Sequence, residues 1–347
     1  MTPAESVAVV LWLGTMIYAV FGGADFGAGL WDLLTGNDRR GKAQRELIDR
    51  AVGPVWEANH TWLIFDLVIL WSAFPGAFAA ITSTLYLPLA LAAVGIVLRG
   101  SGFAFRKLSL RLTGRRAFGL TFAVSSVVTP FFLGTVLGGI ASGRVPQAGG
   151  GDPIVSWLNP TSIVIGLLAV AAGAYIAAAF LTADARRSAP TVVDAFRQRT
   201  FGAGVVAGGI AIAGLLVLRV DAPRLFEGLT GPGLPFVAGS VVAGSVSLAL
   251  CVVSDARWTR AFAVTAVAMI VLGWGVAQYP LLLPPDLTIA AAAAPDGTLQ
   301  ALTVITVAAV AVIGPSLALL FWLQQHRRLE SHPEGQALSR EPRRPPP

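Results

Sequence analysis

Nine long apolar stretches dominate this sequence, and each is long enough to cross a lipid bilayer as a helix. A helix rises about 1.5 Å per residue, so about 20 apolar residues span a hydrocarbon core of about 30 Å. We therefore expect an all-α polytopic membrane protein with one transmembrane domain over residues 1–324. The expected helices cover residues 6–31, 52–74, 77–98, 118–141, 158–183, 201–220, 234–254, 261–279 and 301–324.

The composition agrees with a membrane protein and excludes several other classes. Only 13% of the residues are charged, against about a quarter in soluble domains. The net charge of +6 does not indicate nucleic-acid binding, because the basic residues lie in short loops beside the apolar stretches. Cys251, the single cysteine, lies in an apolar run, which excludes a disulfide framework and a thiolate metal site. The N-terminus has neither a basic region nor a cleavage site, so we expect the first span to be retained.

Proline, glycine and charge mark the segments between the spans. Pro75 and Gly76 separate the second span from the third by a turn. The apolar segment 281–294 is broken by prolines and is expected to be a loop on the membrane surface, and the polar tail 325–347 is expected to be disordered. Three Gly-x-x-x-Gly motifs predict close helix contacts, and they begin at Gly23, Gly134 and Gly204.

The basic residues predict the orientation of the chain. Of the 25 Lys and Arg residues, 22 lie in loops and a tail on one predicted side, and three lie on the other. Since cytoplasmic loops carry the excess of Lys and Arg, the N-terminus is expected outside and the C-terminus in the cytoplasm.

Three acidic residues lie within predicted spans, where a charge costs several kcal/mol and is a functional candidate by default. Asp25 and Glu57 both lie about five to six residues from the cytoplasmic ends of the first two spans, so they share one depth and could share a proton or hold a cation. Asp66 lies near the middle of the membrane. Alternatives remain open: Glu57 could be a helix N-terminal acid, Asp25 could cap a helix break, and Asp66 could bond a neighbouring helix.

The residues around Glu57 are unusually polar for a span. Glu57 and His60 share one helix face, whereas Asn59, Trp62 and Asp66 share another. His60 is the one histidine in a span, since His326 and His332 lie in the tail. Haem requires an axial ligand such as His or Met, and the other candidates in the spans, Met16 and Met269, are weak. We therefore expect this chain to bind no haem and no metal by itself.

Four motifs, taken together, resemble subunit II of cytochrome bd-type quinol oxidases. They are ADFGAG at residues 24–29, GPVWEANHTWL at 53–63, AFP at 73–75 and LRGSGFAFR at 98–106, and a later match covers YP at 279–280 and PPDLTI at 284–289. Together they extend the resemblance over essentially the whole chain.

The resemblance implies nine helices arranged as two four-helix bundles plus one peripheral helix. It implies a haem-free subunit paired with a subunit I that carries two b-type haems and a d-type haem. The complex would oxidise quinol and reduce oxygen to water in the bacterial cell membrane, with membrane lipid around it. Small single-helix subunits are compatible with this assembly. In the family a Trp-acid-x-Asn-x-x-Trp motif lines a proton route from the cytoplasm, which here maps onto Trp56, Glu57, Asn59 and Trp62, with His60 and Asp25 beside it.

Two positions depart from the common family pattern. The usual Asp of the motif is Glu57, followed by Ala58-Asn59-His60, a variant that resembles the cyanide-insensitive branch. The acid often found before Arg106 is Ala104 here, so no role of that acid can be transferred.

Two other functions compete with an oxidase subunit. Paired intramembrane carboxylates and interrupted helices would also suit an independent proton- or cation-coupled transporter, although transporter sites usually lie at the midplane between repeats. The chain could also be a purely structural partner whose acids are inert.

The orientation can be tested with reporter fusions. Fusions after Arg106 and after Arg328 are both expected to report the cytoplasm, because the basic residues gather on that side. An external signal at either position would contradict the predicted topology.

Overall fold

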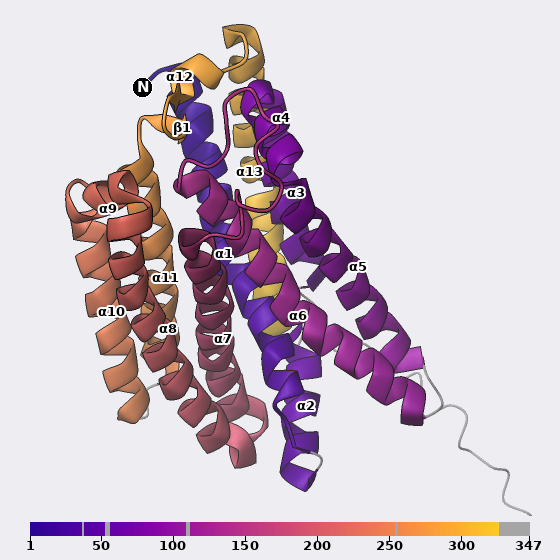
Figure 1. Ribbon diagram of the computed structural model, residues 1–347. Helices are drawn as coiled ribbons and strands as arrows, with labels where there is room; N and C mark the ends of the chain where they lie inside the picture. Colours follow the sequence, from indigo (N-terminus) through magenta and orange to yellow (C-terminus); the bar gives the residue numbers. More distant parts are fainter. Residues whose placement is uncertain (37, 53–55, 109–111, 254–255, 326–347) are drawn as a thin grey trace, which may run out of the picture. The chain divides into compact units, whose positions relative to one another are not determined.

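The computed structural model describes residues 1–36, 38–52, 56–108, 112–253 and 256–325, which are almost entirely helical (Figure 1). In chain order the helices are α1 (Pro3–Leu33), α2 (Arg39–Val52), α3 (Trp56–Ala73), α4 (Pro75–Thr84), α5 (Tyr86–Leu108), α6 (Leu112–Ala141), α7 (Pro160–Ser188), the 3-10 helix η1 (Pro190–Val192), α8 (Val193–Asp221), α9 (Pro223–Thr230), α10 (Leu234–Val252), α11 (Ala256–Gln278), α12 (Ile289–Ala292) and α13 (Asp296–Gln325). The chain forms two compact units, Met1–Leu299 and the part from Gln300 onward, and the packing below is that of the first.

Eight of the described helices are long and apolar enough to cross a membrane, and a ninth span is obtained if α3 and α4 are counted as one bent pair. The predicted all-α polytopic fold is confirmed. Its division into two four-helix bundles plus one helix stays a prediction. The expected disordered tail lies outside the described residues.

The third spanning helix lies further along the chain than the expected residues 77–98. Pro75 begins α4, which is bent by 118° from α3, and the spanning helix is α5, beginning at Tyr86. The bend follows from Pro75, whose missing N–H cannot continue the hydrogen bonds of α3. Since α5 continues to Leu108, Arg99 and Arg106 are helix residues and do not belong to a loop.

Two other segments expected as loops contain regular structure. Most of residues 32–51 form α2, a polar helix that buries Leu47 and Ile48. Within residues 281–294, β1 (Leu281–Leu283) pairs antiparallel with β2 (Leu287–Thr288), and α12 follows. In these short elements the backbone N–H and C=O groups bond to one another. The pattern of apolar residues, which identifies long spans, does not show such short elements.

The core of this unit forms where α1 packs against α3, α6 and α7. Glycine allows the closest approach: a Cβ on Gly27 would lie 2.1 Å from the carbonyl oxygen of Gly173 on α7. Gly134 and Gly138 of α6 likewise lie against Gly166 and Ser162. The first two glycine motifs therefore mark close contacts as predicted. In the third, a Cβ on Gly204 would lie 2.7 Å from the Leu248 side chain, whereas one on Gly208 would meet nothing within 4 Å.

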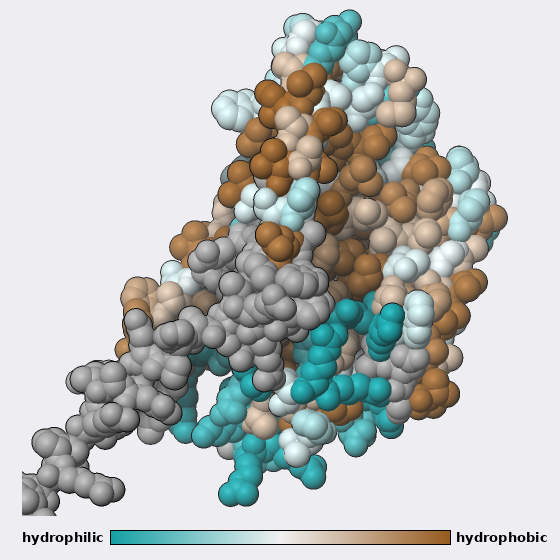
Figure 2. Space-filling view, turned by 180° about the vertical axis from the view of Figure 1, so that it is seen from behind, coloured by the Kyte–Doolittle hydropathy of each residue, from teal (hydrophilic) through white to brown (hydrophobic). Residues whose placement is uncertain are grey.

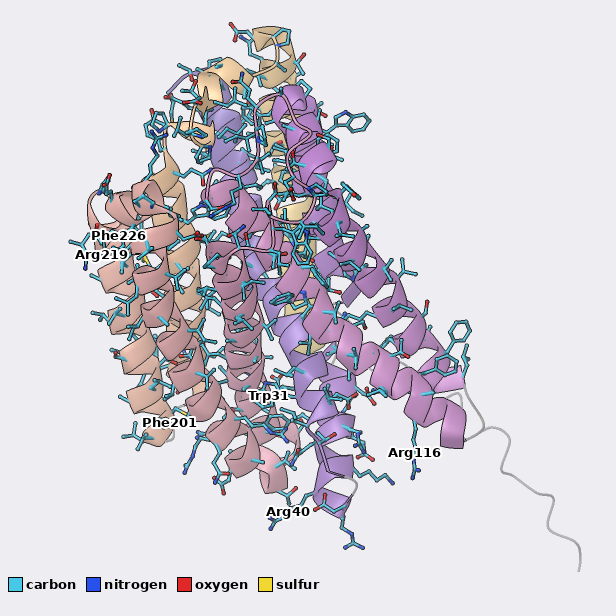
Figure 3. The ribbon with its side chains drawn as sticks, viewed as in Figure 1. Trp31, Arg40, Arg116, Phe201, Arg219 and Phe226 are labelled. Atoms are coloured by element: carbon cyan, nitrogen blue, oxygen red, sulfur yellow. The ribbon has the colours of Figure 1, made fainter. Side chains whose placement is uncertain are left out.

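The two ends of this unit differ in the residues they present. Figure 3 shows Arg40 and Arg116 at one end, and Arg219 and Phe226 toward the opposite end. Hydrophilic residues gather at the end that includes α2 (Figure 2). We call this the basic end, and it contains Arg40 and Arg116, two of the basic residues that the sequence assigns to the cytoplasmic side.

The glycine contact between α1 and α7 can be tested in the assembled complex. Gly27→Ala should lower stability by about 1–3 kcal/mol, because the new methyl group meets backbone that cannot move aside. Thermal unfolding of the purified complex measures the loss. Gly208→Ala is the control, since its methyl group enters open space and alanine favours a helix. Equal losses in both variants would contradict the packing argument.

Candidate functional site

A buried ion pair between Arg99 of α5 and Asp25 of α1 is the centre of the candidate site. Arg99 Nη2 lies 2.8 Å from Asp25 Oδ1, and Nη1 lies 2.9 Å from Oδ2, so the guanidinium group binds both carboxylate oxygens. Nη2 also donates to the main-chain oxygen of Asp25 at 3.0 Å. Each side chain is only 1% exposed. The hydrophobic pattern does not reveal this pair, because it ends the expected span at residue 98 and leaves Arg99 outside it.

The neighbours of the pair surround the Arg99 side chain on the remaining sides. Its Nε donates to Ser126 Oγ of α6 at 2.9 Å. The rings of Phe26 and Phe122 lie 4.9 and 4.8 Å from its Cζ atom, distances at which a cation and an aromatic ring attract. Ser126 fits because the facing residue is Gly29: a Cβ there would lie 2.1 Å from the serine oxygen.

A second ion-pair cluster follows seven residues further along the same two helices. Arg106 Nη1 lies 2.5 Å from Asp32 Oδ2, and Arg106 Nη2 also binds Asp49 of α2. The two aspartates of α1 and the two arginines of α5 are each seven residues apart, and a spacing of seven places side chains on one helix face. This matched spacing was the sequence signal that could have revealed both pairs.

Helix α3 brings two of its predicted site residues onto α1. Asn59 is buried, and its Nδ2 donates to the carbonyl oxygen of Phe21 at 3.2 Å. The ring of His60 lies with its centroid 6.2 Å from that of Phe26, the residue that also covers Arg99. The structure therefore brings Asn59 and His60 close to the Asp25 pair.

The other predicted site residues of α3 are Trp56, Glu57, Trp62 and Asp66, and the side chains of the last two are described. Trp62 is half-buried, and its ring makes an edge contact with Phe65 of its own helix. Asp66 lies further along the seam between α1 and α3, where it faces Gly14 of α1. The side chains of Trp56 and Glu57 lie outside the described residues, although the backbone of both belongs to the first turn of α3.

The sequence of this chain matches a known protein family over almost its whole length. Residues 4–324 match the family described as cytochrome bd terminal oxidase subunit II. The chain belongs to this family. It is therefore a subunit of a quinol oxidase complex and has a subunit I as its partner. This assignment does not favour an independent transporter.

Individual relatives agree with the family over nearly the whole chain. The chain is 23% identical over 369 residues to cytochrome bd-I ubiquinol oxidase subunit 2 of Escherichia coli K12, covering 92% of this chain and 94% of that protein. It is 28% identical over 114 residues, a third of each chain, to cytochrome bd ubiquinol oxidase subunit 2 of Bacillus subtilis. The solved bd oxidase of Geobacillus thermodenitrificans contains a chain with a TM-score of 0.79 and 27% identity, covering 93% of this chain and 98% of that one.

A cytochrome bd complex contains haems, so we asked whether His60 could hold one. His60 packs against Phe26 and is a close neighbour of the Asp25–Arg99 pair. Two cavities among the described residues lie elsewhere, one between α1 and α11 and one beside Pro280, and His60 lines neither. That this chain holds no haem stays a prediction.

The buried pair should dominate the stability of this region. Arg99→Met leaves Asp25 charged and without its partner, which costs about 3–5 kcal/mol in buried pairs, whereas Arg99→Met with Asp25→Leu should recover much of that loss. Thermal unfolding of the complex measures both variants. Asp194→Asn is the control, because the carboxylate of Asp194 is 84% exposed in its pair with Arg197 and such pairs contribute at most about 1 kcal/mol. A double variant that is no more stable than Arg99→Met alone would contradict a coupled pair.

Proposed function

We propose that this chain is a haem-free subunit that carries protons from the cytoplasm to the oxygen-reducing centre of its partner. In this proposal the b-type and d-type haems and the quinol-oxidising site belong to subunit I. The observation that carries it is the buried Asp25–Arg99 pair, with Asn59 and His60 beside it on α3. Polar groups are expensive inside a membrane, so a cluster that reaches inward from the basic end has a functional explanation by default.

Within this cluster we assign the mobile proton to Glu57 and a positioning role to Asp25. Both oxygens of Asp25 are bound by the guanidinium group of Arg99, and protonation of that carboxylate would break a bidentate pair. Glu57 lies in the first turn of α3, three residues before His60. A group that can take and release a proton suits transfer better than one in a fixed pair.

The neighbouring side chains would shape the route without carrying the charge. Asn59 ties α3 to α1 through Phe21, which keeps the first turn of α3 beside Asp25. His60 offers a second titratable group next to the pair, and Trp56 and Trp62 would line the route. We place the basic end in the cytoplasm, in agreement with the charge asymmetry of the loops.

The proton route is tested by removing the charge of Glu57 while keeping its size. Glu57→Gln should reduce oxygen-consuming turnover by about 10²-fold or more, because the amide cannot transfer the proton. Glu57→Asp should retain substantial activity, since the acid remains one methylene shorter. Quinol-dependent oxygen consumption of the purified complex measures both.

A matched control separates this effect from a general loss of charge. Glu46 lies exposed on α2 at the basic end, so Glu46→Gln should leave turnover unchanged. Assembly and the haem spectrum should be normal in all three variants. If Glu57→Gln assembles with normal haem content and turns over like the parent, the acid is structural and the proposed route is wrong.

A further inference from the structure

Asp66 lies deeper in the membrane than the cluster just described, on the same seam between α1 and α3. It follows Glu57 by nine residues, which is about 14 Å along a helix axis. A Cβ on Gly14 of α1 would lie 2.0 Å from Asp66 Oδ1, so the carboxyl group fills the space that any other residue at position 14 would occupy. Asn59 contacts Phe21 and Asp66 contacts Gly14, and both steps are seven residues long in opposite directions. The carboxyl group therefore faces α1 directly.

The structure provides no opposite charge for Asp66 among the described residues. Its Oδ1 atom is buried and has no hydrogen-bond partner there. The ion pairs of the first unit use other acids, such as Asp25, Asp32 and Asp221. A carboxylate at this depth is costly unless it is partnered or neutralised by a proton.

Thr15 follows Gly14, the residue that faces Asp66, and its hydroxyl is a candidate partner for a protonated carboxyl group. Its hydroxyl donates to the carbonyl oxygen of Leu11 at 3.0 Å. A hydroxyl group has one hydrogen and two acceptor positions. While that hydrogen is bound to Leu11, the Thr15 hydroxyl could only accept a further hydrogen bond, and only a protonated Asp66 could donate one to it. When the proton leaves, the hydroxyl can rotate and donate to the carboxylate.

Tyr18 lies on α1 between Thr15, near Asp66, and Asp25 of the ion pair with Arg99, which we call the inner cluster together with Asn59 and His60. It is the one polar side chain of α1 between Thr15 and Asp25. Its ring lies over Gly22, where a Cβ would be 2.8 Å from the ring, and its buried hydroxyl has no hydrogen-bond partner among the described residues. Tyr18 lies within electrostatic range of Asp25, Arg99 and Asp66.

The other titratable groups near Asp66 come from few elements. Helix α3 packs against α1 and α4 in the described part of the chain. Helix α4 carries no titratable side chain. Helix α1 contributes Tyr18 and Asp25, and α3 itself contributes His60, six residues or about 1.7 turns away. Arg99 reaches the same region from α5. The contact between α1 and α3 thus leads from a fixed ion pair, past a tyrosine hydroxyl, to an acid that has no counter-charge in the described part of the chain.

We propose that Asp66 is a proton-binding site in the membrane interior, which takes up a proton delivered along the α1–α3 seam and returns it during turnover. The step is a proton transfer alone: a carboxylate oxygen gains the proton and loses it again, with no change of oxidation state. The inference rests on the proposed proton route, because its protons arrive through the inner cluster.

Infrared difference spectroscopy of the assembled oxidase, reduced minus oxidised, tests the proposal directly. A carbonyl stretching band of a protonated carboxylic acid is expected, shifting in D₂O and missing in Asp66→Asn. Thr15→Val should move this band, because the valine cannot hydrogen-bond to the acid, whereas Thr15→Ser should keep it in place. Glu227→Gln, at an exposed acid of α9, is the control and should leave the band unchanged. Turnover should fall by about tenfold or more in Asp66→Asn.

The outcomes separate this inference from the proposed function. If Glu57→Gln is slow while Asp66→Asn keeps both the band and parental turnover, the proton route stands and the Asp66 site is wrong. If Glu57→Gln turns over like the parent, the route itself is wrong, whatever the band shows. Should Asp66→Asn not assemble, a band that stays in place in Thr15→Val overturns the assignment.

Discussion

The bidentate bond between Arg99 and Asp25 is the interaction on which the rest of this structure depends. A guanidinium group and a carboxylate that are each 1% exposed must satisfy one another, because neither can be solvated. The neighbours of Arg99 must also satisfy its polar groups. Ser126 accepts the Nε hydrogen, and the rings of Phe26 and Phe122 lie against the guanidinium group. Three helices are thereby held in one relative position.

The same constraint is repeated one heptad nearer to the basic end. Asp32 and Arg106 bind one another as Asp25 and Arg99 do, and Arg106 also binds Asp49 of α2. A shared offset between α1 and α5 is the geometry of two helices that run in the same direction. Through Asp49 the polar helix α2 is bound to the spanning helices α1 and α5. These contacts fix α1 and α5 on the side of the Asp25–Arg99 pair that faces the basic end.

Fixed and movable charges are separated along one seam. Near the basic end, Arg99 holds Asp25 as a permanent partner, whereas Asp66 faces a glycine and a threonine whose hydroxyl can act in either sense. A fixed pair can orient its neighbours, and an acid without a counter-charge can change its protonation state. In our proposals the seam combines both, with Glu57 at its entrance.

The sequence by itself determined the fold class, because apolar stretches of this length can only be helices in a membrane. It also identified the acids of α1 and α3 as costly residues, and two glycine motifs as close contacts. Only the tertiary structure decided which groups meet. Arg99 lies at the end of a predicted span, where charge alone is consistent with a loop. The bend at Pro75 shifts the next helix by nine residues and carries Arg99 into the interior. Pairing between Asp25 and Arg99 joins residues 74 positions apart, and such a contact depends on how helices pack, which the hydrophobic pattern of any single helix does not contain.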